Sequence, residues 1–334
     1  MSSAPVVPRP VTPVPTTPQE RRPVQPAGDS VRNWRLRHRI AHGAAWAAGI
    51  FVIAVTASIM GFMAWKGLHY LNPSLIWQRP TPGLAQGDTG GIRDPLIGTL
   101  LATFIGTLFA AALAIATAVW VGEYGKPAKL ARAIESAIEM VAGMPNIVLA
   151  IFGLAIFQLP FFSFLSFKAQ GGGVYGRSFI AAGLIMSLIA IPLIYTATRE
   201  GLAQLPAKLR EGSWALGKTK ICTIRTVLLP QIRPNIATGI VLGMGRIVGD
   251  TAIVVVLLGA ALQIDPVGDT PGLNVLRGGG STLTTYVYAA SPAGEGNAPQ
   301  KAYAAAFLLL LIVVFLNALV GWIGRRTKNS EITQ

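Results

Sequence analysis

The stretch from Phe179 to Thr198 reads FIAAGLIMSLIAIPLIYTAT and carries no charged side chain. An α-helix rises about 1.5 Å per residue, so a stretch of this length crosses the ~30 Å hydrocarbon layer of a bilayer. Charged residues return directly afterwards at Arg199 and Glu200, where such a helix would leave the lipid. The stretch therefore predicts a transmembrane helix.

Apolar runs of similar length flank this one on both sides. Only 13% of the 334 residues are charged and 52% are hydrophobic, so the charges are too few to cover a soluble globule of this size. We therefore expect an all-α membrane protein with six transmembrane helices. We also expect Pro145 and Pro192 to kink their spans. The other five predicted spans are Ala44–Trp65, Pro95–Val121, Ile134–Leu159, Ile236–Leu262 and Tyr303–Ile323.

The basic residues are distributed unevenly along this alternation of spans and loops. Of the 28 Lys and Arg residues, 20 fall in segments on one side of the six spans and 7 on the other. Basic loops stay in the cytoplasm, so both chain termini are expected there. The formal net charge of +14 is then explained by the basic residues that keep the cytoplasmic segments on their side of the membrane. Membrane lipid is the expected partner of these charges, and nucleic acid is not.

The composition also predicts the division of the chain. Residues 1–42 are expected to be a disordered, proline-rich, basic cytoplasmic tail without the apolar region of a secretory signal peptide. Residues 43–93 hold the first span and a periplasmic-side loop. Residues 94–324 hold the other five spans as the working bundle, with a cytoplasmic loop at 199–234. Residues 325–334 form a second cytoplasmic tail.

The cytoplasmic segment 199–234, called the long loop below, is basic and amphipathic. Leu202, Leu205 and Leu209 are spaced to share a helical face, and Gly217 offers a helix stop. We expect two short helices outside the membrane. Their apolar side chains could anchor a partner protein, and the alternative is an amphipathic linker lying on anionic lipid.

Within the long loop, small residues recur at fixed distances from Glu211. Gly212 and Ser213 follow it directly, Gly217 stands six residues after it, and Leu229-Pro230 closes the pattern. This spacing resembles the EAA loop of type I ABC-importer permeases. The resemblance implies a permease fold of MetI-like type that docks onto a separate ATP-hydrolysing subunit. The coupling residues it implies are Glu211, Gly212, Ser213, Trp214, Leu216, Gly217, Leu229 and Pro230.

The stretch Gly212–Thr219 also matches the phosphate-binding pattern G-x-x-x-x-G-K-[ST]. Such a loop follows a buried strand in a sheet domain of ~100 residues or more, whereas here it follows an amphipathic helix. We therefore expect ATP on a partner subunit and no cofactor on this chain. No catalytic constellation is apparent, and the three histidines, His38, His42 and His69, are too scattered for a metal site.

The predicted span 236–262 contains two opposite charges. Arg246 and Asp250 are four residues apart and so share a helical face. Charges are costly in lipid, so these two should pair with each other, with a neighbouring subunit or with a solute. The arginine fork suits phosphate oxygens, and the carboxylate can orient it or accept a proton from hydrogen phosphate. The alternative is that the two charges only fix helix packing. Four glycines are expected to allow close packing of this helix: Gly239, Gly243, Gly245 and Gly249.

The segment from Gly245 to Thr251 resembles the Gly-Arg-x-x-Gly-Glu-Thr segment of phosphate-specific ABC permeases, with Asp250 where most of that family has Glu. Gly90-Gly91-Ile92 and Gly143-Met-Pro-Asn146 resemble it too. The resemblance implies a multi-pass permease subunit of an ATP-driven phosphate importer in the bacterial cytoplasmic membrane. Residues implied on the path of inorganic phosphate are Arg246, Asp250 and Thr251.

The same resemblance implies three protein partners. They are a homologous permease, two copies of an ATPase subunit and an extracytoplasmic phosphate-binding protein. Two alternatives remain open at this point: an importer of sulfate, molybdate or another oxyanion, and an ATP-independent channel or carrier. A carrier would typically show inverted repeats and would need no docking loop.

Overall fold

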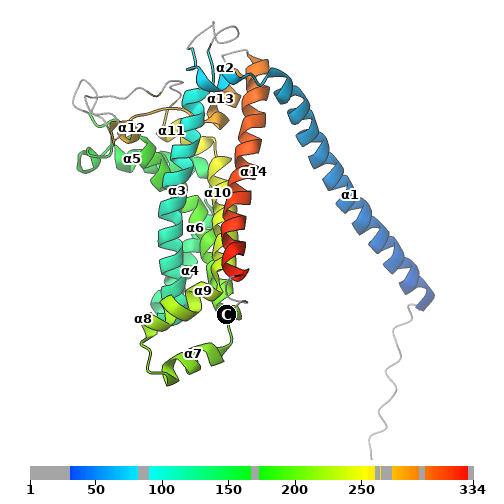
Figure 1. Ribbon diagram of the computed structural model, residues 1–334, viewed down its shortest axis with the longest axis vertical. Helices are drawn as coiled ribbons and strands as arrows, with labels where there is room; N and C mark the ends of the chain where they lie inside the picture. Colours follow the sequence, from blue (N-terminus) through cyan, green and yellow to red (C-terminus); the bar gives the residue numbers. More distant parts are fainter. Residues whose placement is uncertain are drawn as a thin grey trace, which may run out of the picture. The chain divides into compact units, whose positions relative to one another are not determined.

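The computed structural model describes residues 31–81, 90–166, 173–259, 264, 273–292 and 298–329. These residues form helices joined by short connections (Figure 1). The helices are α1 (Val31–Tyr70), α2 (Pro73–Trp77), α3 (Arg93–Val119), the π-helical η2 (Trp120–Tyr124), α4 (Ala128–Gly143), α5 (Asn146–Phe157), the 3-10 turn η3 (Pro160–Phe162), α6 (Phe179–Gln204), α7 (Ala207–Ala215), α8 (Lys220–Thr223), the π-helical η4 (Ile224–Leu228), α9 (Leu229–Gln231), α10 (Arg233–Val248), α11 (Ala252–Leu257), α12 (Leu273–Arg277), α13 (Leu283–Ala290) and α14 (Pro299–Asn329).

The chain divides between Ile59 and Met60 into two units, which are described separately. In the first unit, α1 begins at Val31, inside the segment 1–42 that was predicted to be a disordered tail. The rest of that predicted tail, residues 1–30, lies outside the described residues. The helix continues beyond the predicted end of the first span and reaches Tyr70 in the second unit.

In the second unit, α6 is the central helix. The helices α3 and α10 pack along it, and α14 packs on α10 (Figure 1). In the most apolar part of α6, 67% of the residues are buried, against 22% in α3 and 11% in α14. The outer helices instead expose large apolar side chains such as Phe104 and Phe315. Lipid or another membrane subunit would have to cover these surfaces.

Two of the four predicted packing glycines bring α10 against α6. A Cβ added to Gly239 would lie 2.9 Å from the Cβ of Ala197, and one added to Gly243 would lie 3.1 Å from Ile194. The close approach predicted for these two glycines is therefore confirmed. An added Cβ at Gly245 or Gly249 would have no other helix within 4 Å among the described residues, so the close packing predicted for these two glycines is not seen there.

Four of the predicted spans coincide with helices that are long and apolar enough to cross a membrane: Arg37–Tyr70, Arg93–Tyr124, Phe179–Gln204 and Pro299–Trp322. Pro192 lies inside α6, which continues through it. The last helix ends at Asn329, within the predicted tail 325–334.

The predicted third span, Ile134–Leu159, is not one straight helix. It consists of α4 and α5, which are bent by 108° at the connection between Gly143 and Asn146. Pro145 explains the break, because proline has no N–H to donate and forces the residue before it out of helical geometry. Met144 accordingly has φ −75° and ψ 137°. The kink expected at this proline is confirmed.

The predicted fifth span, Ile236–Leu262, is also interrupted. Its first part, α10, has 16 residues and is about 24 Å long, which is short for a membrane crossing. The chain leaves helical geometry at Asp250 and Thr251 before α11 begins. The described residues therefore contain four long spans and one bent pair, and the fifth predicted span is not confirmed as a continuous helix.

The two ends of the second unit are formed by different short helices. The short helices α5, α11, α12 and α13 gather at one end of the long helices, and α7, α8 and α9 gather at the other (Figure 1). The first group includes α5 and α11, which are the second parts of the two interrupted spans. The second group consists of helices of the long loop. The residues predicted for the solute path and for ATPase docking therefore lie in different parts of the bundle.

We expect Gly98→Ala to destabilise the bundle. A Cβ at this position of α3 would collide with the backbone oxygen of Ser281 and lie 3.3 Å from the Phe179 ring, so the backbone before α13 would have to move. Overpacking of this kind costs about 1–3 kcal/mol. The matched control is Gly321→Ala, since no heavy atom of the described residues lies within 4 Å of its added Cβ. Equal apparent melting temperatures of the two variants in detergent would contradict this packing.

Candidate functional site

Three polar side chains meet where the two interrupted spans approach each other. Arg246 comes from the last turn of α10, Asp250 from the break that follows, and Asn146 from the first turn of α5. The helices that begin at these breaks, α5 and α11, pack together. We call Arg246, Asn146 and Asp250 the polar cluster.

Within the polar cluster, Asp250 is buried and fully engaged. Asp250 is only 6% exposed. Its Oδ2 accepts a hydrogen bond from the Nδ2 of Asn146. Its Oδ1 accepts a second one, of 2.7 Å, from the backbone N–H of Ile253. The carboxylate thereby caps α11 in place of a missing helical partner. The Thr284 hydroxyl of α13 donates to the Asp250 backbone oxygen over 3.4 Å.

Arg246 differs from Asp250 in its surroundings. Its side chain is exposed, and its Nη2 donates one long hydrogen bond of 3.5 Å to the Oδ1 of Asn146. An arginine fork can offer five donors, and most of those of Arg246 have no acceptor among the residues that the structure describes. The arrangement presents a cation at the edge of the cluster while the carboxylate stays inside.

Of the three pairings considered for Arg246 and Asp250, the direct contact between them is not present. The two were expected on one helical face, but α10 ends at Val248, and Asp250 therefore leaves the helical register. Asn146 lies between their charged groups instead, because its amide accepts from one and donates to the other. Thr251 precedes α11 and is partly buried, and its side chain makes no capping bond.

Sequence reasoning had assigned no role of its own to Asn146. A usable signal was available: a Pro-Asn step inside an apolar run marks irregular backbone, which membrane proteins tolerate where it is buried or lines a cavity. Its contact with Asp250 could not be foreseen, since the two residues are 104 positions apart.

An apolar groove beside the bundle is separate from this cluster. A groove of about 450 Å³ between α3, α10 and α14 is lined by Leu100, Phe104, Leu108 and Met244, among others. No charged side chain lines it. Such a surface suits lipid or an apolar helix and offers nothing to an anion.

The long loop forms the second candidate region. Two short helices were expected there, and α7 and α8 confirm them; the second continues through η4 and α9. The turn between them depends on Gly217, whose φ of +73° favours glycine. The Gly217 N–H donates to Trp214 O over 2.9 Å and the Lys218 N–H to Ser213 O over 3.2 Å. This is the Schellman pattern that ends helices.

The predicted coupling residues divide into an exposed and an internal group. Ser213 is buried, and its hydroxyl lies 2.8 Å from that of Thr223, which holds α7 against α8. Leu229 packs on a small core formed around Leu228 and Ile232, and Pro230 beside it is partly buried. The exposed group consists of Glu211, Gly212, Trp214, Leu216 and Gly217.

Two large apolar side chains predicted as anchors are indeed at the surface. Trp214 is 48% exposed and Leu216 is 80% exposed, and Ile221 of α8 adds a third at 63%. The predicted common face of Leu202, Leu205 and Leu209 is wrong, because α6 ends at Gln204 and the three leucines belong to different segments.

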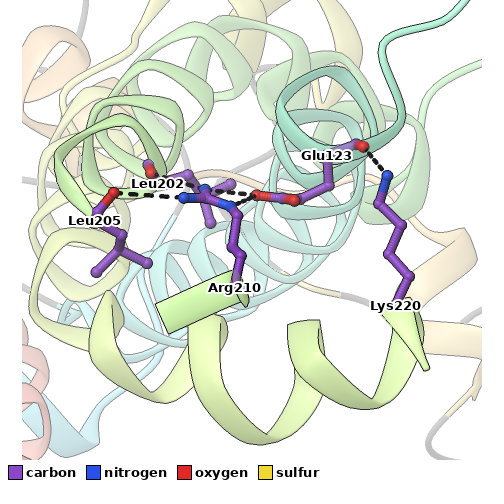
Figure 2. Close-up of polar contacts among 5 residues, drawn as sticks. All are labelled: Glu123, Leu202, Leu205, Arg210 and Lys220. Carbon is purple, nitrogen blue, oxygen red and sulfur yellow. Dashed lines mark hydrogen bonds and ion pairs between the residues drawn. The ribbon is translucent and has the colours of Figure 1, made fainter. Parts of the chain in front are cut away.

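An ion pair joins the long loop to the end of α3 (Figure 2). The Nη2 and Nε of Arg210 in α7 donate to one oxygen of Glu123, over 2.7 and 3.0 Å. The same guanidinium donates to the backbone oxygens of Leu202 and Leu205, at the end of α6, over 3.2 and 3.4 Å. Lys220 of α8 donates to the Glu123 backbone oxygen.

Two further contacts support this junction. The Lys220 ammonium lies 4.5 Å from the centre of the Tyr124 ring, within range of a cation–π interaction. Arg199, near the end of α6, forms an ion pair of 2.8 Å with Glu135 of α4. The Glu123–Arg210 pair was not predicted from the sequence, because its members are 87 positions apart.

Comparison with known proteins identifies the family to which this architecture belongs. Residues 112–329 match the family model described as "Binding-protein-dependent transport system inner membrane component". The phosphate transport system permease protein PstA 1 of Mycobacterium tuberculosis is 29% identical over 314 residues, covering 92% of this chain and 96% of that protein. The permease protein PstC of Pasteurella multocida is 28% identical over 235 residues, covering 64% and 71%.

A solved structure shares the fold. In the crystal structure of a bacterial alginate ABC transporter with a periplasmic binding protein, one chain superimposes with a TM-score of 0.57 at 17% identity, covering 88% of this chain and 95% of that one. At this identity the likeness concerns the fold alone. The family model covers well over half of the residues, and the chain therefore belongs to the family of binding-protein-dependent transport system inner membrane components.

Proposed function

We propose that this chain is a permease subunit of an ATP-driven importer and that its transported solute is inorganic phosphate. The observation that carries the proposal is the polar cluster. An exposed arginine lies there beside a buried carboxylate that caps α11, at the place where two spans are interrupted. Broken helices near the middle of a membrane bundle are a recurrent way to expose polar groups to a solute.

The chemistry of the cluster suits an oxyanion. Arg246 offers a planar fork of donors that matches two phosphate oxygens at once. Asp250 is occupied by Asn146 and by the start of α11, so its role is to hold the cluster and repel surplus anions rather than to bind the solute. Thr251, next to this carboxylate, lies on the same path. The relatives named as phosphate permeases favour phosphate over sulfate or molybdate.

The long loop supports the coupling to ATP hydrolysis. Trp214 and Leu216 form an exposed apolar surface on α7, and Glu211 adds a charge beside it. Exposed aromatic and aliphatic anchors of this kind are typical of interface centres. We place an ATPase subunit on this surface. ATP binds and is hydrolysed there and not on this chain, whose Gly212–Thr219 stretch is a helix end followed by a turn.

The remaining partners follow from the same assignment. One is a homologous permease, which would complete the path and cover the apolar faces of α3 and α14. A second ATPase copy would serve that permease. An extracytoplasmic phosphate-binding protein would deliver the solute. We place the chain in the bacterial cytoplasmic membrane, with both termini and the long loop on the cytoplasmic side.

We expect Arg246→Ala to abolish transport without disturbing assembly. Removal of the guanidinium deletes the donors for the anion, and uptake of phosphate at limiting concentration should fall at least about tenfold. Arg246→Lys should retain part of the activity, because it keeps the charge without the fork. The measurement is uptake of labelled phosphate by cells, with a pull-down of the ATPase subunit.

The matched control is Arg132→Ala, which removes an exposed arginine of α4 that bonds only to its own helix. Its uptake should stay within about twofold of wild type, as expected for an exposed site. Unchanged phosphate uptake in Arg246→Ala would exclude phosphate as the solute bound by this arginine. Sulfate or molybdate uptake by the same cells would then identify a different oxyanion importer, and uptake without ATP would indicate a channel or carrier.

We expect Gly217→Val to uncouple the chain from its ATPase subunit. A β-branched residue at φ +73° is strained by roughly 1–2 kcal/mol, so the turn after α7 should open and displace Trp214 and Leu216. Binding of the ATPase subunit should weaken in a pull-down. Gly321→Val is the control, since Gly321 lies in α14, outside the long loop, and its added Cβ meets no neighbouring side chain or other helix within 4 Å among the described residues. Equal binding by the two variants would argue against docking on this loop.

The native Cys222 allows a direct test of the proposed topology. It is the single cysteine of the chain, it lies in α8, and it is partly exposed. A membrane-impermeant maleimide should label it in inverted membrane vesicles and leave it unlabelled in intact spheroplasts. The reverse pattern would place the long loop outside and remove the ATPase surface from the cytoplasm.

A further inference from the structure

Glu123 occupies an unfavourable position for a negative charge. It lies in η2, the last turn of the helix that begins with α3, where the helix dipole disfavours anions. Its side chain is only 6% exposed, so water provides little compensation. A buried carboxylate at a helix C-terminus is stable only with a partner, and that partner is Arg210 of the long loop.

Arg210 compensates a second helix end at the same time. Helix ends leave carbonyl groups without a helical donor, and the guanidinium donates to two of them at the end of α6. Leu202 O accepts from Arg210 in addition to the Leu205 N–H, and Leu205 O, on the residue that ends the helix, accepts from Arg210. The Arg210 side chain is 21% exposed. A single planar group therefore joins the end of α3, the end of α6 and the first helix of the long loop (Figure 2).

The second helix of the long loop is fixed to the same point. Lys220 donates to the Glu123 backbone and lies over the Tyr124 ring, while the Ser213 and Thr223 hydroxyls hold α7 to α8. Two π-helical segments adjoin these contacts: η2, which contains Glu123, and η4, which follows α8. Such segments are frequent at functional sites and break the regular helical ladder.

Separation of α7 from the bundle would remove the partner of a buried charge and the Arg210 donor from two backbone oxygens, of which Leu202 O would keep only the 3.4 Å bond from the Leu205 N–H. Because each of these losses is costly, α7 and the ends of α3 and α6 should move as one body. We propose that Arg210 and Glu123 form a rigid joint that transmits displacement of the long loop to α3 and α6. They are positioning residues, since their charged groups bond to each other and to backbone oxygens at the end of α6 and not to the polar cluster. This inference rests on the proposed function, in which an ATPase subunit supplies the displacement.

The variant that tests the joint is Arg210→Lys. Lysine keeps the charge beside Glu123 but is a single point donor, so it cannot also reach the two carbonyls of α6 in the fork geometry. A second variant, Glu123→Gln with Arg210→Gln, removes both charges together and avoids a lone buried ion. Arg225→Lys is the matched control, because Arg225 is an exposed arginine of the same loop.

The importer is reconstituted with its partner subunits, and imported phosphate is measured per ATP hydrolysed. We expect both joint variants to retain the ATPase subunit and to hydrolyse ATP, with the phosphate imported per ATP reduced about tenfold, as for residues that carry coupling. The control should keep the wild-type ratio. A wild-type ratio in both joint variants would overturn the proposal, and so would loss of the ATPase subunit from both, since the pair would then serve docking alone.

A second readout does not depend on the solute. Spin labels at Lys126 and Lys208, two exposed positions on either side of the joint, report the distance between the end of α3 and α7 in a Cys222→Ser background. The distance distribution should be narrow in the wild-type joint and broad in both joint variants. Equal widths would overturn the joint. Absence of ATP-driven phosphate uptake in the wild type would overturn the proposed function instead.

Discussion

Backbone amide and carbonyl groups in a bilayer have no water to bond with, so each must find its partner inside the protein. Helices α3, α6 and α14 meet this constraint within themselves. The chain leaves helical geometry at Pro145 and again at Asp250, and side chains compensate there. Asp250 accepts from the Ile253 amide in the first turn of α11, and Asn146 in turn donates to Asp250. The interrupted backbone and the polar cluster thus depend on each other, because the residues that stabilise the breaks are also those that position Arg246.

The two arginines near helix ends illustrate how surroundings decide chemistry. Both Arg210 and Arg246 lie near helix C-termini, where the dipole favours a cation. Arg210 is saturated by a carboxylate and two carbonyls and is largely buried. Arg246 has one long bond and is exposed. The first is therefore suited to hold elements together, and the second has donors left for an anion.

The sequence predicted the class of fold well and the shape of individual spans less well. Uncharged runs such as Phe179–Thr198 identify helices because length and apolarity suffice. The same criteria cannot show that Ile134–Leu159 bends by 108°, since hydropathy carries no direction. Arg246 was recognised because a charge in a span is conspicuous. Asn146 and Glu123 were not, because their roles arise from contacts 104 and 87 positions away. The helix stop at Gly217 was predictable, since it depends on local backbone alone.

The burial of α6 has a consequence for how the protein is made. This helix leaves the ribosome before α10, which later covers it, so it must first stand in the membrane with its future core facing lipid. Two of its hydroxyls are satisfied without neighbouring helices: Ser187 donates to Leu184 O and Thr198 to Ile194 O, each over 2.7 Å within the helix. The helix is thus compatible with lipid before it is compatible with its neighbours. Membrane insertion and bundle assembly can therefore proceed as two separate stages of biogenesis.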